Sequence, residues 1–141
     1  MATTRIANAH WEGSLFEGAG KVSLDSSGLG EFDVTWASRA EDPNGRTSPE
    51  ELIAAAHSSC FSMALSNGLA GAGTPPQALD TRAEVDFQPG QGITEIRLTV
   101  RGKVDGISEE DFVAAAQTAK LNCPVSQALT GTTITLDASL A

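Results

Sequence analysis

The chain has 141 residues, of which 40% are hydrophobic, and a formal net charge of −9 from 9 basic and 18 acidic side chains. This size and composition predict one globular domain, residues 1–141, with a hydrophobic core of its own. An acidic chain without a Lys/Arg cluster gains little from counterion release, so nucleic acid and anionic membranes are excluded as expected partners. Residues 1–20 contain no continuous apolar run, so we expect no signal peptide, no spanning helix and a cytoplasmic, reducing location.

The first third of the chain is rich in strand patterns. Apolar and polar residues alternate over residues 22–25 and again over residues 32–36, which is the period of half-buried strands. The intervening D-S-S-G-L-G supplies turn residues. Residues 5–12 form a weaker candidate strand, and residues 37–48 are predicted to be a long loop.

A long helix is predicted from Pro49 to about Asn67. Ser48 is a suitable N-cap, Pro49 suits the first helical position, and Glu51 completes a capping box. Apolar and small side chains surround the axis of this helix, and such a helix must be covered on nearly all sides. We expect one six-stranded sheet on one side of it, and a second helix or a second subunit on the other.

The rest of the chain alternates between clear strand and helix signals. In order, we predict a hairpin with strands near residues 83–87 and 96–100, a helix opened by Ser108 that runs to about Lys120, a short helix beginning at Asn122-Cys123-Pro124, and a last strand at residues 132–137. Strand runs and helix runs are segregated rather than alternating singly, which predicts an α+β fold.

The two cysteines are the strongest functional clue. Cys60 lies in the middle of the long helix, and Cys123 directly precedes Pro124. Each taken alone is better explained as a small buried core residue. A helix start would lower the pKa of Cys123 and leave it partly accessible. Two such cysteines in a reducing compartment favour reversible sulfur chemistry over a structural staple. The absence of a Cys-x-x-Cys motif argues against a redox pair of the thioredoxin type.

His57 lies three residues before Cys60, on the same helix face. It could act as a base or stabilise a thiolate, and a cysteine hydrolase built on this pair is a weaker alternative; a packed, hydrogen-bonded histidine is the simplest interpretation. Zinc held by His57, Cys60, Cys123 and His10 is disfavoured, because structural zinc sites use closely spaced ligand pairs. We therefore expect no metal and no cofactor.

Four stretches together resemble the OsmC/Ohr family of thiol peroxidases. They are A-H-W-E-G near the start, S-R in the loop before the long helix, T-S-P-E-E-L-I-A-A-A-H-S-S-C-F-S-M-A-L in the helix itself, and N-C-P-V-S late in the chain. The resemblance covers almost the whole chain in order. It implies antiparallel sheets with a long central helix, assembled as an intertwined homodimer with active sites at the subunit interface.

The resemblance also implies roles for individual residues. Cys60 matches the peroxidatic cysteine, Cys123 the resolving cysteine, and Glu50 the carboxylate that orients an active-site arginine. In the Ohr branch this arginine lies near the N-terminus, where the present chain has Lys21 in E-G-A-G-K-V. In the OsmC branch it comes from the loop before the helix, which favours the OsmC branch and Arg39, with Arg46 as the alternative in the same loop.

The implied activity is thiol-dependent reduction of hydroperoxides to alcohols in oxidative stress defence, through a Cys60 sulfenic acid and an intrachain disulfide, with an external dithiol of dihydrolipoyl or thioredoxin type as reductant. The apolar neighbours expected around Cys60, namely Ala56, Phe61, Met63 and Ala64, favour organic hydroperoxides over hydrogen peroxide. An alternative is a non-catalytic stress or small-ligand-binding protein of the same fold.

Overall fold

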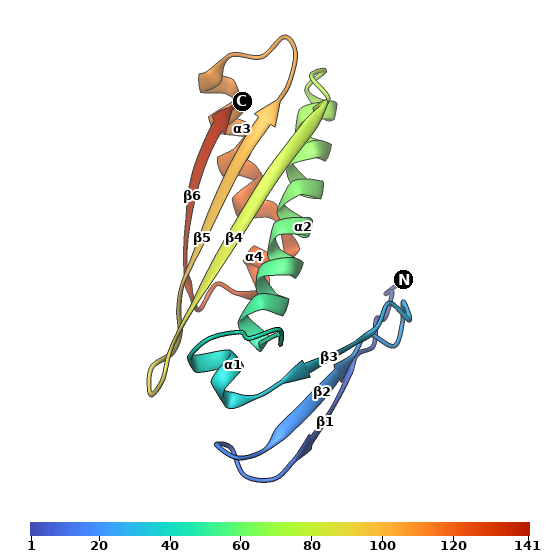
Figure 1. The fold of residues 1–141 in the computed structure, drawn as a ribbon. Coiled ribbons are helices and arrows are strands. Elements are labelled where there is room, and N and C mark those ends of the chain that lie inside the picture. The colour runs from blue at the N-terminus through green and yellow to red at the C-terminus, as the bar shows by residue number, and fades with distance from the viewer. The chain divides into compact units, whose positions relative to one another are not determined.

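The computed structural model describes all residues from Met1 to Ala141. The elements are β1 (Asn8–Glu12), β2 (Ala19–Ser23), β3 (Glu31–Val34), α1 (Trp36–Ala40), α2 (Pro49–Gly71), β4 (Ala78–Gln88), β5 (Gly92–Lys103), α3 (Glu109–Asn122), α4 (Pro124–Ala128) and β6 (Thr133–Leu140) (Figure 1). The two three-stranded sheets, together with the long helix α2, confirm the α+β class. The chain divides into two compact units, Met1–Leu52 and Ile53–Ala141, and a single domain stays a prediction.

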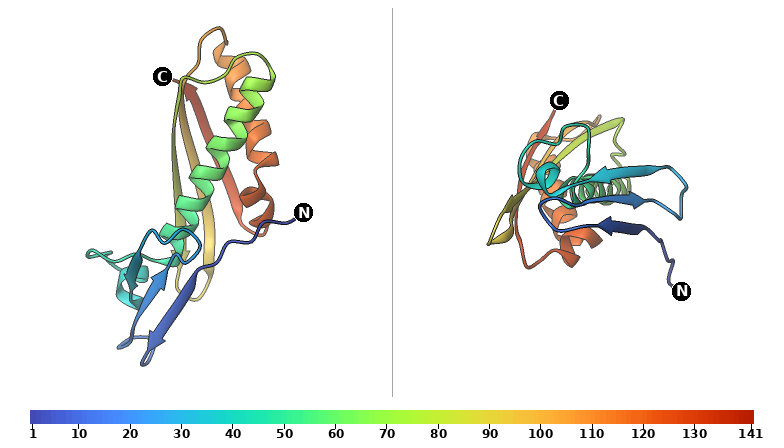
Figure 2. Two further views of the ribbon diagram at one scale, coloured as in Figure 1. Left: turned by 90° about the vertical axis from the view of Figure 1, so that its right-hand side faces the viewer. Right: turned by 60° about the horizontal axis from the view of Figure 1, so that its bottom comes forward.

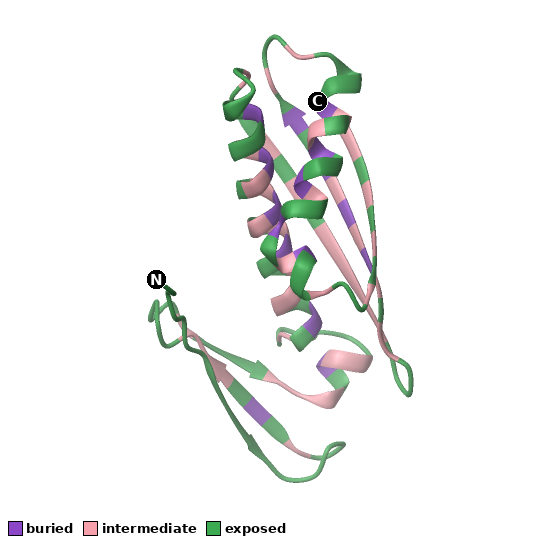
Figure 3. Ribbon diagram, turned by 180° about the vertical axis from the view of Figure 1, so that it is seen from behind, coloured by how far each residue is buried: buried purple, intermediate pink, exposed green.

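The first unit contains an antiparallel sheet in the order β1-β2-β3. Its apolar side chains are poorly covered, as the mainly green ribbon of Figure 3 shows. Phe16 and Leu29 are 75% and 79% exposed, and no buried apolar side chain belongs to this unit. The Phe16 ring packs edge-on against Trp36, with ring centroids 5.7 Å apart.

Part of the predicted loop is helical, and Trp36 begins α1 rather than extending β3. The reason is a capping box that the sequence pattern did not reveal: Ser38 N–H donates to the Thr35 hydroxyl at 3.0 Å, and Thr35 N–H donates back to Ser38 Oγ at 3.0 Å. The Ser38 hydroxyl also donates to the Thr47 carbonyl at 2.9 Å. These bonds fix α1 against the residues that lead into α2.

The second unit contains a sheet in the order β4-β5-β6, with α2 and α3 side by side on one face (Figure 2). The hairpin of β4 and β5 is antiparallel, as predicted, with Ala83 opposite Leu98. The expectation of a single six-stranded sheet is wrong, because the six strands form two separate three-stranded sheets. The strands of the second sheet are also not all antiparallel, because β6 pairs with β5 in parallel. The chain returns to the sheet only after α3 and α4 have crossed its face, and such a crossover delivers a parallel strand.

The core of the second unit lies between this sheet and its two helices. Three groups of buried apolar side chains meet there: Ile96, Leu98 and Val100 from β5; Phe61, Leu65 and Leu69 from α2; and Phe112, Ala116 and Ala119 from α3. Full burial of a large apolar side chain contributes about 1.5–3 kcal/mol. A Cβ at Gly102 would lie 2.5 Å from the Phe112 ring, so only glycine lets this ring pack directly on β5.

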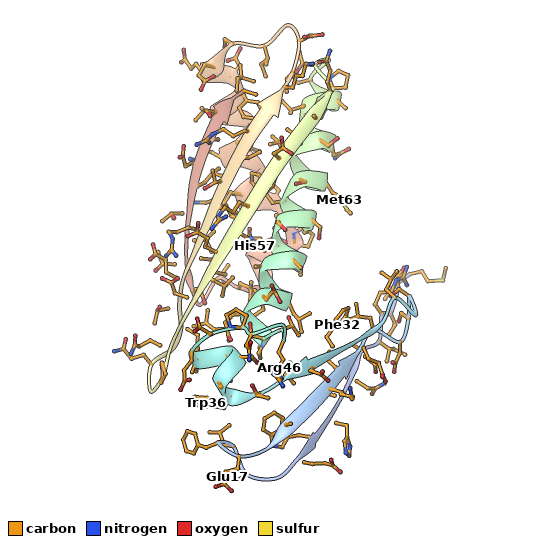
Figure 4. All side chains as sticks on the ribbon, viewed as in Figure 1. Glu17, Phe32, Trp36, Arg46, His57 and Met63 are labelled. Carbon is orange, nitrogen blue, oxygen red and sulfur yellow. The ribbon has the colours of Figure 1, made fainter.

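The long helix α2 extends four residues beyond the predicted end at Asn67, to Gly71. Glu51 N–H donates to the Ser48 hydroxyl at 3.1 Å, whereas the Glu51 carboxylate accepts from the Thr47 hydroxyl at 2.5 Å instead of closing the expected capping box. In Figure 4, the side chain of Met63 points outward from α2, and this residue is 71% exposed. No helix in the structure has both the length and the apolar character needed to span a membrane.

Candidate active site

Cys123 occupies the junction of two helices. It is the C-cap of α3 and the N-cap of α4, with φ −58° and ψ 121°, and Pro124 is the first residue of α4. Proline disfavours the helical conformation in the residue before it, so Pro124 ends α3 at Asn122 and turns Cys123 out of the helical path. Cys123 is fully buried, which corrects the expectation that it would be partly accessible.

Cys60 reaches this junction from the middle of α2. Its thiol hydrogen-bonds to Cys123, and both cysteines are free. Four-residue spacing on α2 places Phe61 and Leu65 in the core, and Cys60, one position earlier, faces the neighbouring helix pair. The structure thus brings together two thiols that the sequence separates widely.

The two thiols have opposite pKa shifts. Burial raises the pKa of Cys60; a hydrogen bond from Val125 N–H opposes this, whereas the neighbouring Cys123 adds to it. Burial also acts to raise the pKa of Cys123, but hydrogen bonding from Ser126 N–H, the Cys60 thiol, the Ser126 hydroxyl and Val125 N–H outweighs it and leaves the pKa lowered. Within one chain, negative charge is therefore favoured on Cys123.

An open groove of about 590 Å³ leads to Cys60. Its lining comes from α2, α3 and the start of α4 and comprises Cys60, Met63, Ala64, Asn67, Gly68, Ala115, Thr118, Ala119, Asn122 and Pro124. Met63 and Ala64 were expected near the thiol. Phe61 instead lies in the core, and Ala56 does not reach the groove. Short and apolar side chains dominate the lining, and Cys60 is its only ionisable group.

His57 does not pair with Cys60. It is fully buried, and its Nε2 lies 2.7 Å from the hydroxyl oxygen of Ser126 on α4, while its Nδ1 has no hydrogen-bond partner. Burial lowers the pKa of His57. Ser126 was not singled out from the sequence, and the only signal for it was its place in N-C-P-V-S, three residues after Cys123 and thus in the first turn of α4.

Arg39 and Glu50 form a two-pronged ion pair in the first unit. Arg39 Nε donates to Glu50 Oε1 and Oε2 at 3.0 and 3.2 Å, and Nη2 donates to Oε2 at 3.0 Å. Glu50 is buried, and the Arg39 side chain is 31% exposed. The alternative arginine, Arg46, is exposed and its Nη1 lies 3.5 Å from the Asn44 carbonyl. The sequence-predicted carboxylate thus holds Arg39 rather than Arg46, while Lys21 pairs with Asp33 at 2.8 Å.

The side chains weighed as zinc ligands do not assemble into a metal site. No group of three or more histidine, cysteine, aspartate or glutamate side chains is arranged to hold an ion. His10 lies on β1, in the first unit, where it faces Glu12 at 3.5 Å and is well exposed. His57 uses its only bonded nitrogen for Ser126.

Comparison with known proteins places these features in a family. The sequence model of the OsmC-like protein family matches residues 42–137. The chain is 43% identical over 143 residues to peroxiredoxin OsmC of Escherichia coli strain K12, with 99% of each sequence covered. Among solved structures, an organic hydroperoxide resistance protein from Elizabethkingia anophelis matches with a TM-score of 0.73 and 26% identity over the full length of both chains.

A second solved structure, the organic hydroperoxide resistance protein OsmC from Legionella pneumophila, covers 99% of the chain with a TM-score of 0.73. At 24% identity it supports the fold alone. The family match covers most of the chain, and the identity to the Escherichia coli protein extends from end to end. The chain therefore belongs to the OsmC-like protein family, and to its OsmC branch.

Proposed function

We propose that this chain is a thiol-dependent peroxidase that reduces organic hydroperoxides to alcohols, with Cys60 as the peroxidatic and Cys123 as the resolving cysteine. The observation that carries the proposal is the pair of free thiols in hydrogen-bonding reach of each other beside an open groove. The names of two relatives, a peroxiredoxin and an organic hydroperoxide resistance protein, support the same chemistry.

Access to the groove supports this division of roles. Cys60 is only partly buried and lines the groove, whereas Cys123 is fully buried behind it. A hydroperoxide can therefore reach the sulfur of Cys60 but not that of Cys123. The lower pKa of Cys123 favours it as a thiolate, which suits a second nucleophile that attacks only its neighbour.

The cycle has three steps. The Cys60 thiolate attacks one oxygen of the hydroperoxide, the O–O bond breaks, and the departing alkoxide takes up a proton to give the alcohol. The Cys123 thiolate then attacks the sulfenic acid sulfur, forming the disulfide as the S–O bond breaks and water leaves. An external dithiol supplies two electrons by exchange, attacking the accessible Cys60 sulfur and releasing Cys123. The reductant would be of dihydrolipoyl or thioredoxin type in the cytoplasm.

Burial alone makes Cys60 a poor nucleophile, because it raises the thiol pKa. An arginine about 4 Å away, at an effective dielectric near 20, would offset this by up to about 4 kcal/mol, or two to three pKa units. Arg39, aligned by Glu50, is the residue we assign to this task. Nucleophilicity falls with pKa at a slope of about 0.4–0.5, so Arg39 must also stabilise the negative charge developing on the leaving oxygen.

The active enzyme would be a homodimer. The first unit buries no apolar side chain of its own, and exposed apolar surface of this kind is typical of subunit interfaces. Sedimentation at micromolar concentration should therefore show a dimer without a stable monomer. A well-folded monomer under these conditions would mean that no second copy covers this surface.

The direct test is mass spectrometry of the intact, reduced chain after one equivalent of cumene hydroperoxide. A peroxidase of this type should convert to the disulfide, with the loss of two hydrogens and of both free thiols, and a dithiol should restore the starting mass. An unchanged mass with both thiols still free would reject the proposed activity and favour a binding protein of the same fold.

A further inference from the structure

A buried hydrogen-bond chain runs from α2 to the sulfur of Cys123. Nε2 of the fully buried His57 lies 2.7 Å from Oγ of Ser126, which is 5% exposed. Ser126 is the third residue of α4, whose N-cap is Cys123, and its hydroxyl interacts with the Cys123 sulfur, which is also fully buried. The packed side chains around them are apolar, so each of these polar groups depends on the next for its hydrogen bond.

The tautomer of His57 decides which way the hydrogen bonds between His57, Ser126 and Cys123 run, because a hydroxyl has only one hydrogen to donate. If Nε2 carries the proton, it donates to Ser126 Oγ and leaves the hydroxyl hydrogen free for the Cys123 sulfur. If Nδ1 carries the proton, the Ser126 hydroxyl donates to Nε2 and the sulfur loses this donor. The second arrangement also leaves a buried Nδ1–H without a partner, and orphaned buried N–H groups are rare. The first arrangement is therefore favoured.

The Ser126 hydroxyl matters most after the peroxide has reacted. In the reduced protein, the Cys60 thiol also donates to the Cys123 sulfur. That S–H donor is lost when Cys60 ionises and is then oxidised to a sulfenic acid. The Ser126 hydroxyl is then the neutral side-chain donor that remains on Cys123, together with backbone N–H groups of Val125 and Ser126. Donors to the charged form keep a buried thiol ionised.

We propose that His57 is a positioning residue for the resolving step. By donating from Nε2, His57 turns the Ser126 hydroxyl toward Cys123. The Ser126 hydroxyl then holds the Cys123 sulfur as a thiolate while this sulfur attacks oxidised Cys60. This inference rests on the proposed function. The S–S bond forms as the S–O bond of the sulfenic acid breaks, and the leaving hydroxide takes up a proton to give water.

No charged side chain around Cys123 replaces these hydrogen bonds in stabilising its thiolate. The titratable groups that face Cys123 are Cys60 and, through Ser126, His57, both from α2. On α3, Lys120 donates to the Ile134 carbonyl of β6 at 3.1 Å. The five residues of α4 carry no charge. No lysine or arginine contributes to the pKa of Cys123.

Loss of the Ser126 hydroxyl as a donor should slow the resolving step by an amount that can be calculated from the pKa of Cys123. Each unit by which the Cys123 pKa rises lowers the thiolate fraction about tenfold, and the higher intrinsic nucleophilicity returns about threefold. The net slowing at neutral pH is thus about threefold per unit, and about three- to thirtyfold for a shift of one to three units. It should vanish at a pH high enough to ionise Cys123 in every variant.

The experiment follows one turnover by stopped flow and quenched mass spectrometry. Reduced wild type is first shown to consume one equivalent of cumene hydroperoxide, which tests the proposed function separately. Peroxide loss then reports the first phase, and decay of the trappable sulfenic acid reports the second. Ser126→Ala and His57→Leu should slow the second phase about three- to thirtyfold and move its pH profile upward, without slowing the first phase.

Two further variants distinguish positioning from a structural effect. His57→Gln keeps an N–H donor of similar reach and should restore most of the second-phase rate, and Ser126→Ala/His57→Leu should be no slower than Ser126→Ala alone. An unchanged second phase and pH profile in Ser126→Ala overturns the inference, even if His57→Leu fails to fold. Equal slowing of both phases in Ser126→Ala or His57→Leu, or no rescue by His57→Gln, also overturns it.

Discussion

The two units of this chain differ in how far they stabilise themselves. Every buried apolar side chain belongs to the second unit, where β5, α2 and α3 enclose a continuous core. In the first unit the buried residues are Gly20, Ser38 and Glu50, and its sheet leaves Phe16 and Leu29 mostly exposed. Packing within one chain therefore fixes the two thiols, whereas the Arg39–Glu50 pair lies in a unit that lacks an apolar core.

This contrast divides the expected effects of mutation. Changes in the second unit should alter the sulfur chemistry or the stability of the chain itself. Changes to the ion pair in the first unit should alter the rate of peroxide reduction and leave the thiol pair in place. The following predictions test this division, beginning with the largest expected effect.

Cys60→Ser should lower peroxide reduction by roughly 10³-fold or more, because it removes the covalent nucleophile. Cys123→Ser should still consume about one equivalent of hydroperoxide and then stop as a sulfenic acid, one oxygen heavier. Single-turnover peroxide consumption and intact mass measure both outcomes. First-turnover activity retained in Cys60→Ser would reverse the assigned roles.

Arg39→Ala should lower kcat/KM by about 10²–10³-fold, the usual effect of removing a group that stabilises transition-state charge, and Glu50→Gln should do so more mildly. The matched control is Arg46→Ala, since Arg46 is exposed and lies in the same loop. Rates compared at a pH where every variant is fully thiolate separate charge stabilisation from the pKa effect. Equal rates at that pH would show that Arg39 acts only through the Cys60 pKa.

Cumene and tert-butyl hydroperoxides should be reduced up to about 10²-fold more efficiently than hydrogen peroxide. Each methylene buried against the apolar lining of the groove, such as Met63 and Ala64, contributes about 0.8 kcal/mol, or about 3 kcal/mol for four carbons. Steady-state kinetics with one dithiol measure the ratio. A clear preference for hydrogen peroxide would refute the apolar-groove interpretation and leave the thiol chemistry intact.

Gly102→Ala should destabilise the second unit by about 1–3 kcal/mol, the usual cost of overpacking a core. The added Cβ would lie 2.5 Å from the Phe112 ring, whereas a Cβ at Gly131 meets no atom within 4 Å. Gly131→Ala is therefore the matched control and should change little. Urea unfolding of both variants decides the point, and equal midpoints would mean that Phe112 shifts at no cost.

The smallest expected effect is a pH dependence of stability from His57. Burial lowers its folded-state pKa, so below about pH 6.5 the unfolded chain binds a proton that the folded chain does not. Its contribution is fully present above that pH and is lost as the pH falls, by at most about 1.4 kcal/mol per unit. Wild type and His57→Gln should therefore diverge in unfolding free energy between pH 7.5 and 5.5, and parallel curves would contradict this.

Local features of this fold could be predicted because neighbouring residues determine them. The alternation in β4 and β5, with a turn rich in glycine and proline between them, determined the hairpin and its register. Ser108 capped α3 as predicted, with its hydroxyl accepting from Asp111 N–H at 3.1 Å. Pro124 likewise dictated the break between α3 and α4. The sequence missed α1, because serine replaces the usual glutamate or glutamine at the third position of its capping box.

Contacts between distant residues were decided by the tertiary structure. The sequence by itself singled out Cys60, Cys123, Arg39 and Glu50 through their motifs. It also favoured a packed, hydrogen-bonded His57, but only the tertiary structure identified Ser126 as the partner of His57. The parallel pairing of β6, the burial of Cys123 and the opposite pKa shifts of the two thiols arise in the same way. Burial and hydrogen-bond partners depend on which elements pack together. Local sequence patterns do not determine this packing, because it depends on residues far apart in the chain.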